Sequence, residues 1–391
     1  MTIIRRNLLD SFCRRLRRYP IVMVMGPRQS GKMTLCRTVL SDRPHVSLRR
    51  LDVRTEVRLD PEGFVREYRD GAVIHDAQLE TVLIAYLREL VDEDPAPGRF
   101  VLTGSMHFGL SPVINAWMAR RVGVLQLLPP GFDELARFGR PPPSMLDALW
   151  TGAYPTIHQG NISPRVWLRD HLAAYLDRDV LPLRNIANLG AFSEFVRLVA
   201  GRTAEEVNLS ALAADVGIRH NTVKAWLHVL ESSFLVFRVP AYRPNVRTRQ
   251  IKAPKLHFLD SGLACYLLGI RSAEELRHHP LRGQIFESWV AAEVFKAITH
   301  RGEEPRLRHY RAAGTEVNLV IDRGERLILA EAKSGATVVP RFLLGMRTLG
   351  KALGRTGLFV DRRLIYGGDF PHRHGDVDVL PWNRMLEKTW N

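Results

Sequence analysis

Short apolar runs alternate with amphipathic stretches through the first third of the chain. Residues 21–25, Ile-Val-Met-Val-Met, form a run typical of a strand that is buried on both faces. Similar runs predict further strands, at 45–51, 71–74, 100–102 and 122–128. Residues 7–18 and 79–91 instead repeat their apolar side chains at helical spacing. This alternation predicts an α/β domain with a parallel sheet covered on both faces.

Two helices followed by a basic hairpin are predicted in the middle of the chain. Residues 208–232 have the form of a helix-turn-helix, with Asn208 or Ser210 as the first cap and Gly217 in the turn. Two apolar strands flank a basic segment beyond them, at 234–239 and 255–259. This layout is that of a winged helix with a positive wing.

The last part of the chain predicts one helix and three strands, at 284–298, 307–311, 315–321 and 327–333. Glu287 falls on the helix, Glu316 and Asn318 on the second strand, and Glu331 and Lys333 on the third. A helical Glu, a strand acid and then E-x-K form the layout of the PD-(D/E)xK nuclease fold, whose carboxylates hold Mg²⁺. Asn318 stands where that pattern has Asp, which removes one negative charge. We therefore expect a folded, inactive relative of the nucleases; an active nuclease and an unrelated α/β domain are the alternatives.

The segment after the first strand has the spacing of a phosphate-binding loop. G-x-x-x-x-G-K runs from Gly26 to Lys32, between a strand and a helix, so the backbone N–H groups and the helix dipole can hold an anion. The residue after the lysine should be Ser or Thr to bind Mg²⁺, yet it is Met33, and Thr34 lies about 100° further round the helix. The predicted nucleotide-binding residues are Gly26, Pro27, Arg28, Gln29, Ser30, Gly31, Lys32, Met33 and Thr34.

Asp76 is the candidate acid for the metal side of this loop. In P-loop ATPases the strand beside the phosphate loop ends in an Asp that holds the Mg²⁺ shell, and an adjacent Glu polarises the attacking water. Here that strand ends in Ile74-His75-Asp76. Either His75 takes the first position and Asp76 the second, or Asp76 is itself the metal-shell acid. A neutral imidazole is a poor partner for Mg²⁺, which prefers oxygen ligands.

These motifs together resemble the prokaryotic AAA+-like ATPases that carry a DUF4143 C-terminal region. The resemblance rests on seven segments: Gly26–Lys32, Asp76–Gln78, Leu102–Ser105, Gly152–Pro155, Arg178–Val180, Phe258–Leu263 and Phe286-Glu287. It implies an ATP-binding domain, a winged-helix region and a nuclease-like C-terminus. It also implies that Ser105 or Thr103 senses the γ-phosphate and that Arg121 is a candidate arginine finger or phosphate sensor. A solvated basic corner is the alternative for Arg121.

The net charge of +15 suggests a polyanionic partner, most simply DNA, although an arginine-rich proteome would also explain it. The candidate DNA contacts lie on the second helix and the wing: Arg219, Asn221, Lys224, Arg243, Arg247 and Arg249. The alternative is a module that only packs against the rest of the protein.

Composition narrows the remaining possibilities. The chain of 391 residues is long enough for two or three domains, predicted at 1–140, 141–275 and 276–391. Its three separated cysteines fit a reducing cytoplasm, and we expect no membrane span. A surface loop is favoured over a metal site for the polar cluster His372, His374, Asp376 and Asp378. The sequence carries no signal for an oligomer.

The leading hypothesis is a cytoplasmic ATP-binding protein whose hydrolysis is weakened or absent, with ATP acting as a conformational ligand. Met33 and His75 each remove an oxygen ligand, and Asn318 removes a negative charge, so the three altered positions argue against Mg²⁺ as a cofactor. One alternative is a working ATPase that uses Asp76 as its metal-shell acid. The other is a scaffold or DNA-binding module with no nucleotide role.

Overall fold

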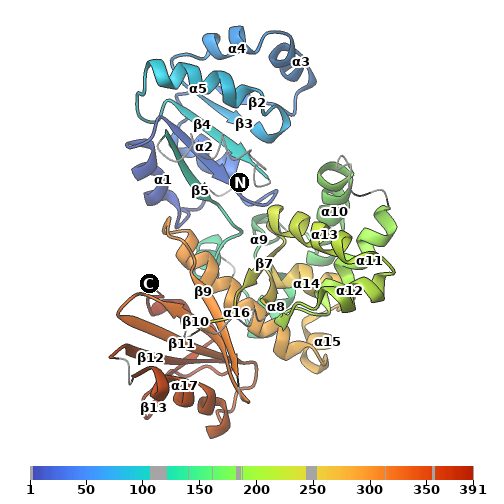
Figure 1. The fold of residues 1–391 in the computed structure, drawn as a ribbon, viewed down its shortest axis with the longest axis vertical. Helices are drawn as coiled ribbons and strands as arrows, with labels where there is room; N and C mark the ends of the chain where they lie inside the picture. The colour runs from blue at the N-terminus through green and yellow to red at the C-terminus, as the bar shows by residue number, and fades with distance from the viewer. Residues whose placement is uncertain are drawn as a thin grey trace. The chain divides into compact units, whose positions relative to one another are not determined.

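The computed structural model describes most of the chain, namely residues 3–105, 121–139, 141–160, 162–181, 186, 188–243, 253–312, 314–354 and 357–390 (Figure 1). Its contacts divide it into two compact units. The first comprises Met1–Pro130, Ser232–Phe234 and Thr299–Glu304. The second comprises Gly131–Glu231, Leu235–Ile298 and Pro305–Asn391. The three-domain boundaries expected from the sequence stay a prediction.

The first unit contains the predicted parallel sheet, in the order β2-β3-β4-β1-β5. Its strands are β1 (Ile21–Met25), β2 (His45–Ser47), β3 (Ala72–His75), β4 (Phe100–Gly104) and β5 (Val122–Gln126). Every residue of β1 and β4 is buried, as their unbroken apolar runs predict. Because the strands are parallel, their carboxyl ends share one edge of the sheet.

The helices of this unit are α1 (Leu9–Leu16), α2 (Lys32–Val39), α3 (Leu51–Leu59), α4 (Pro61–Glu67), α5 (Leu83–Glu93) and the short 3₁₀ turn η1 (Ala77–Leu79) (Figure 1). Phe12 of α1 and Leu35 of α2 pack with Val22 and Val101 of the sheet in one core. The strand expected at 45–51 ends at Ser47, and α3 follows it. Helix α3 was not predicted because it has no apolar face, with Val57 its one buried residue.

The second unit begins with a helical part. Its helices are α7 (Phe132–Leu135), α8 (Met145–Thr151), α9 (Pro155–Gln159), α10 (Pro164–Tyr175), α11 (Leu189–Ala200), α12 (Leu209–Val216), α13 (His220–Ser232), α14 (Ser261–Leu267) and α15 (Ala273–His278). The predicted helix pair is confirmed as α12 and α13. Asn208 caps α12 through a bond from the Ala211 N–H, and Gly217 ends it in the left-handed conformation at φ 72°. An antiparallel sheet in the order β6-β8-β7 accompanies them, built from β6 (Glu205–Glu206), β7 (Val236–Val239) and β8 (Lys255–Phe258).

The rest of the second unit is a mixed sheet in the order β13-β14-β12-β11-β10-β9 (Figure 1). Its elements are α16 (Arg282–Thr299), β9 (Leu307–Ala312), β10 (Thr315–Asp322), β11 (Arg326–Lys333), α17 (Leu344–Gly354), β12 (Phe359–Tyr366), β13 (His372–His374) and β14 (Val377–Pro381). Strand β10 pairs antiparallel with β9 and β11, whereas β11, β12 and β14 run parallel. Met346 and Leu349 of α17 pack against this sheet. The helix and three strands predicted around Glu287, Asn318 and Glu331 are confirmed.

Candidate functional site

The phosphate loop lies between β1 and α2, as predicted. Gly26 has φ 153°, and a Cβ atom there would lie 2.0 Å from the Leu127 carbonyl oxygen, so the position accepts only glycine. Gly31 is left-handed at φ 98° and leads directly into α2. The Lys32 ammonium donates hydrogen bonds to the carbonyls of Gly26 and Pro27, at 2.8 and 2.7 Å. The lysine therefore folds back over the loop that it follows.

Two polar groups inside the loop fit a site for phosphate. The Ser30 hydroxyl is fully buried and has no hydrogen-bond partner among the described residues. Beside it the buried Arg6 guanidinium donates to the carbonyls of Ser30 and Leu128, each at 2.7 Å. Arg6 therefore fixes the loop to the segment after β5. The sequence prediction missed this role, because no local pattern places a residue before α1 beneath a loop more than twenty residues away.

The position after Lys32 supplies no hard oxygen ligand. Met33 is 37% exposed, and its thioether is only a weak acceptor. Thr34, on the next helical position, is exposed. A Mg²⁺ ion held between this helix and a phosphate would find no side-chain hydroxyl at the expected place.

Both ring nitrogens of His75 take part in a buried hydrogen-bond chain. Its Nδ1 lies 3.2 Å from Thr103 Oγ1, and its Nε2 lies 3.0 Å from His45 Nδ1. His45 Nε2 lies 3.0 Å from the Leu40 carbonyl, which can only accept, so the donors run from Thr103 through both histidines to Leu40. The Asp76 N–H completes the chain at Thr103 Oγ1. Burial, with a smaller effect of His45, lowers the pKa of His75 to about 4, so the imidazole is neutral and has no nitrogen left for a metal.

Asp76 follows β3 and is held by Arg49. Nε and Nη2 of Arg49 lie 2.6 and 3.1 Å from the two carboxylate oxygens, a bidentate pair. Burial acts to raise the pKa of Asp76, but Arg49, with Lys32 and Arg28 of the phosphate loop, outweighs it and lowers the pKa. The carboxylate is therefore charged, and its partner is a guanidinium. Strand β4 lies between β3 and β1. Asp76 therefore follows a strand one removed from the phosphate-loop strand, whereas the sequence predicts the strand directly beside the loop.

Two further arginines hold the segment that follows Asp76. Arg54 and Arg58, one turn apart on α3, lie 3.4 and 2.7 Å from the buried Glu80 carboxylate. Together with Arg49, they tie the stretch from β2 to α3 to the stretch after β3. The sequence shows the three arginines at helical or near-helical spacing. It does not show which acidic residues they contact, because those lie more than twenty residues away.

The other residues expected to sense phosphate lie at opposite ends of the sheet. Ser105 follows β4 at the carboxyl edge, and its hydroxyl accepts from Gln78 Nε2 at 3.0 Å. Its role as a γ-phosphate sensor stays a prediction. Arg121 precedes β5, whose first residue pairs with Ile21, so it lies at the amino edge and forms an ion pair with Asp92 of α5. Five residues of strand, about 16 Å, separate that edge from the phosphate loop. Arg121 therefore lies away from the loop of its own chain, and its role as an arginine finger or phosphate sensor stays a prediction.

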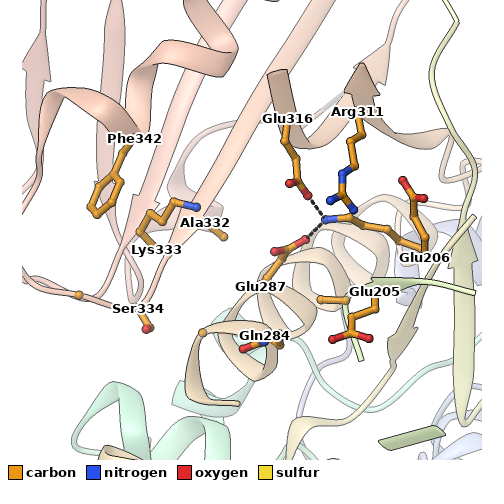
Figure 2. Close-up of a pocket in the computed structure, with 14 residues that line it drawn as sticks. Glu205, Glu206, Gln284, Glu287, Arg311, Glu316, Ala332, Lys333, Ser334 and Phe342 are labelled. Carbon is orange, nitrogen blue, oxygen red and sulfur yellow. Dashed lines mark hydrogen bonds and ion pairs between the residues drawn. The ribbon is translucent and has the colours of Figure 1, made fainter. Parts of the chain in front are cut away.

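The second unit contains a cavity of about 620 Å³ next to the predicted nuclease-like residues (Figure 2). Glu287 of α16 and Glu316 of β10 line it, and each forms an ion pair with Lys255 of β8, at 2.6 and 2.7 Å. Burial raises the pKa of Glu287 despite the lysine. For Glu316, burial acts upward too, but the bond and charge of Lys255 prevail and lower the pKa. Lys333 also lines the cavity.

Asn318 and Glu331 are not among the residues that line this cavity. The side-chain Oδ1 of Asn318 accepts a hydrogen bond from the Ala332 backbone N–H at 2.8 Å, and the Asn318 backbone N–H donates to Glu331 Oε2 at 3.3 Å. Burial, opposed by Lys333 at 2.7 Å, raises the pKa of Glu331 to about 7. Across the described part of the chain, no three His, Cys, Asp or Glu side chains converge as a metal site would require.

The candidate DNA contacts are only partly described. Arg219, Asn221 and Lys224 are exposed on the turn and on α13, and Arg243 is exposed after β7. Arg247 and Arg249 lie outside the described residues. None of the described helices is long and apolar enough to cross a membrane.

Three family models match successive parts of the chain. An AAA domain matches residues 18–136, a domain of unknown function (DUF8612) matches 143–274, and another (DUF4143) matches 282–385. The chain carries an AAA-type P-loop domain. Such a domain implies nucleotide binding, as the loop geometry also indicates. The sequence predictions named the first and third of these families but not the second.

Known relatives and solved structures add context. Two uncharacterized proteins, from Mycobacterium bovis and Mycobacterium tuberculosis, are each 26% identical over 298 residues, which cover 75% of this chain and 66% of theirs. This chain thus spans about two thirds of their length. A Walker-type ATPase of Pyrococcus abyssi is 14% identical, with a TM-score of 0.46 over 68% of this chain and 96% of its own. A RuvB variant of Thermotoga maritima is 17% identical, with a TM-score of 0.28 over 60% of this chain and 89% of its own.

Proposed function

We propose that this protein binds ATP at its phosphate loop as a conformational ligand and hydrolyses it slowly or not at all. One observation carries the proposal: Asp76, the acid expected to serve the metal, is bound on both oxygens by Arg49. Met33 and His75 strengthen it, since neither offers an oxygen or a free nitrogen at the metal side.

The loop itself suits a polyphosphate. Its backbone N–H groups, the start of α2 and Lys32 supply the donors and positive charge that phosphate oxygens need. Arg28 and Arg49 add cationic charge close enough to act on Asp76. Three basic side chains around one carboxylate favour binding of the nucleotide anion without a divalent ion.

Magnesium would supply a Lewis acid and align the attacking water, but the residues present do not fit it. A hydroxyl is missing after Lys32, and the Asp76 carboxylate is paired with Arg49. We therefore derive no hydrolytic step through a metal at this site.

ATP can act on conformation through Arg49. This side chain is 44% exposed and bonded to a single residue on the segment after β3. A bound triphosphate is a second anion that competes for the same guanidinium. Competition between Asp76 and phosphate for Arg49 would shift the segment from Asp76 to Glu80. In the absence of ATP, Arg54 and Arg58 of α3 also hold this segment, through Glu80.

Calorimetry of ATP binding tests the proposal. The wild type should bind ATP in EDTA, and Lys32→Ala should lose affinity by roughly ten- to a hundredfold, because it removes a charged hydrogen-bond donor to phosphate. Arg50→Ala is the matched control, because Arg50 pairs with the exposed Asp52 rather than with the site. A wild type with no nucleotide affinity would leave the scaffold interpretation, and rapid Mg²⁺-dependent turnover would favour the working ATPase that uses Asp76.

Contact with DNA is a second candidate function, favoured by the polar face of α13. Asn221, Lys224 and His228 recur at helical spacing and are all exposed, and Arg219 precedes them. If this pair of helices and the β7–β8 hairpin act as a winged helix, log affinity for a duplex should fall with log salt at a slope near −0.9 per phosphate contact. Lys224→Glu should make that slope shallower, with Glu231→Gln on the same helix as the control. An unchanged affinity in Lys224→Glu would leave a packing role for this module.

A further inference from the structure

We propose that Lys255 is the resident cation of the acid cluster in the second unit and stands where a divalent metal would otherwise be held. The proposal is independent of nucleotide binding. It rests on the position of one ammonium group between two carboxylates at the wall of a cavity.

The geometry places the lysine between two elements that are far apart in sequence. Its Nζ lies 2.6 Å from Glu287 Oε1 and 2.7 Å from Glu316 Oε1, the two contacts drawn as dashed lines in Figure 2. The Lys255 side chain is only 3% exposed. An ammonium this buried is stable only with charged partners, and these two bonds use two of its three donors.

The two other oxygen ligands of the nuclease-like pattern, Asn318 and Glu331, are already engaged. The side-chain oxygen of Asn318 accepts a hydrogen bond from the backbone of β11. Glu331 accepts one from the Asn318 backbone N–H and forms an ion pair with Lys333. Glu287 and Glu316 are the two carboxylates that contact Lys255, while Glu205 and Glu206 also line the cavity. A Mg²⁺ ion, which needs about six oxygen ligands, does not fit unless the lysine leaves.

Lys255 enters this cluster from β8, the strand that also pairs with β7. Glu287 belongs to α16, and Glu316 belongs to β10. One ammonium thus joins the small antiparallel sheet to the mixed sheet and its long helix. The lysine replaces the metal as an organiser of the acids, but it cannot activate water, so the cavity lacks the chemistry of a metal-dependent nuclease.

Thermal unfolding of the nucleotide-free full chain with Mn²⁺ tests this proposal. Lys255→Met should unfold at a lower temperature than the wild type, and Mn²⁺ at about ten times its Kd should recover roughly 2–4 °C by replacing the lost charge. The wild type and the charge-retaining Lys255→Arg should show no Mn²⁺ shift. Lys333→Met is the control for the other lysine at the cavity. Adding Glu287→Gln to Lys255→Met should abolish the Mn²⁺ shift and raise the unfolding temperature, because it removes the unpaired carboxylate.

Two results would overturn the proposal. One is a wild type that binds Mn²⁺, by electron paramagnetic resonance, at a site that Glu287→Gln removes, since the metal and the lysine would then coexist. The other is a Lys255→Met protein that is as stable as the wild type or does not respond to Mn²⁺. If Lys255→Met fails to fold, the Lys255→Met/Glu287→Gln double variant decides. It should fold if the lysine acts as a counter-ion, and its failure would contradict that role.

Discussion

Each unit contains an acidic site in which a basic side chain forms an ion pair with a carboxylate, but the basic side chains of the two sites differ in burial. Arg49 reaches Asp76 from a loop and remains 44% exposed, whereas Lys255 is only 3% exposed between Glu287 and Glu316. An exposed guanidinium can turn to another anion and be hydrated while it moves. A buried ammonium cannot leave without stranding the Glu287 carboxylate, although Glu316, which is 40% exposed, can be hydrated. The comparison indicates a releasable pair in the first unit and a permanent one in the second.

The largest expected effect is at the buried pair. Lys255→Met should lower the free energy of unfolding by about 3–5 kcal/mol, because it leaves Glu287 buried without its partner. Denaturant titration measures this loss, with Lys351→Met, at an exposed position of α17, as the control. A loss under about 1 kcal/mol would mean that Lys255 is no more firmly held than Arg49, and would contradict the comparison.

The buried histidine chain of the first unit should appear in the pH dependence of stability. The pKa of His75 in the folded protein is about 4, below its ordinary value near 6.5, so the unfolded chain binds more protons between these values. Its contribution is intact above pH 6.5 and is lost as the pH falls toward 4. From pH 7 to 5.5 the wild type should lose about 1 kcal/mol more than His75→Asn does. Parallel pH profiles would show that His75 titrates alike in the folded and unfolded states and would contradict the lowered pKa.

The smaller effect of the two ion pairs is expected at the pair of Arg49 and Asp76, whose basic side chain is exposed. Arg49→Ala should lower the free energy of unfolding by about 1–2 kcal/mol, less than Lys255→Met does, because the largely buried Asp76 loses one partner but keeps Lys32 and Arg28 nearby. Chemical denaturation without nucleotide measures it, beside Arg50→Ala. A loss as large as that of Lys255→Met would mean that Arg49 is a fixed structural element rather than a releasable one.

Local features of this molecule could be predicted from its sequence, whereas its ion pairs could not. The phosphate loop was found because a strand, two glycines, a lysine and a helix are consecutive along the chain. The helix pair α12 and α13 and the two acidic strand positions, Glu316 and Glu331, are similarly local. Arg6, Arg49 and Lys255 were missed because each acts on a group that only tertiary folding brings close.

The position of Arg121 on the sheet, by contrast, could have been predicted. Strand direction was available from the alternating pattern, and a residue before a parallel strand must lie at the amino edge. The family resemblance suggested a function for Arg121, and the geometry of its own sheet places that arginine away from the phosphate. A motif therefore needs its position on the sheet before a role is assigned to it.

The central claim is that Arg49 replaces the metal on Asp76, and calorimetry of ATP binding to the wild type and Arg49→Ala, in EDTA and in Mg²⁺, tests it most directly. The wild-type affinity should be the same in both buffers within about twofold. Arg49→Ala should bind weakly in EDTA and gain about tenfold from Mg²⁺, because Asp76 is then free to serve the metal. A wild type that needs Mg²⁺ to bind ATP, with Arg49→Ala unchanged in that need, would contradict the account.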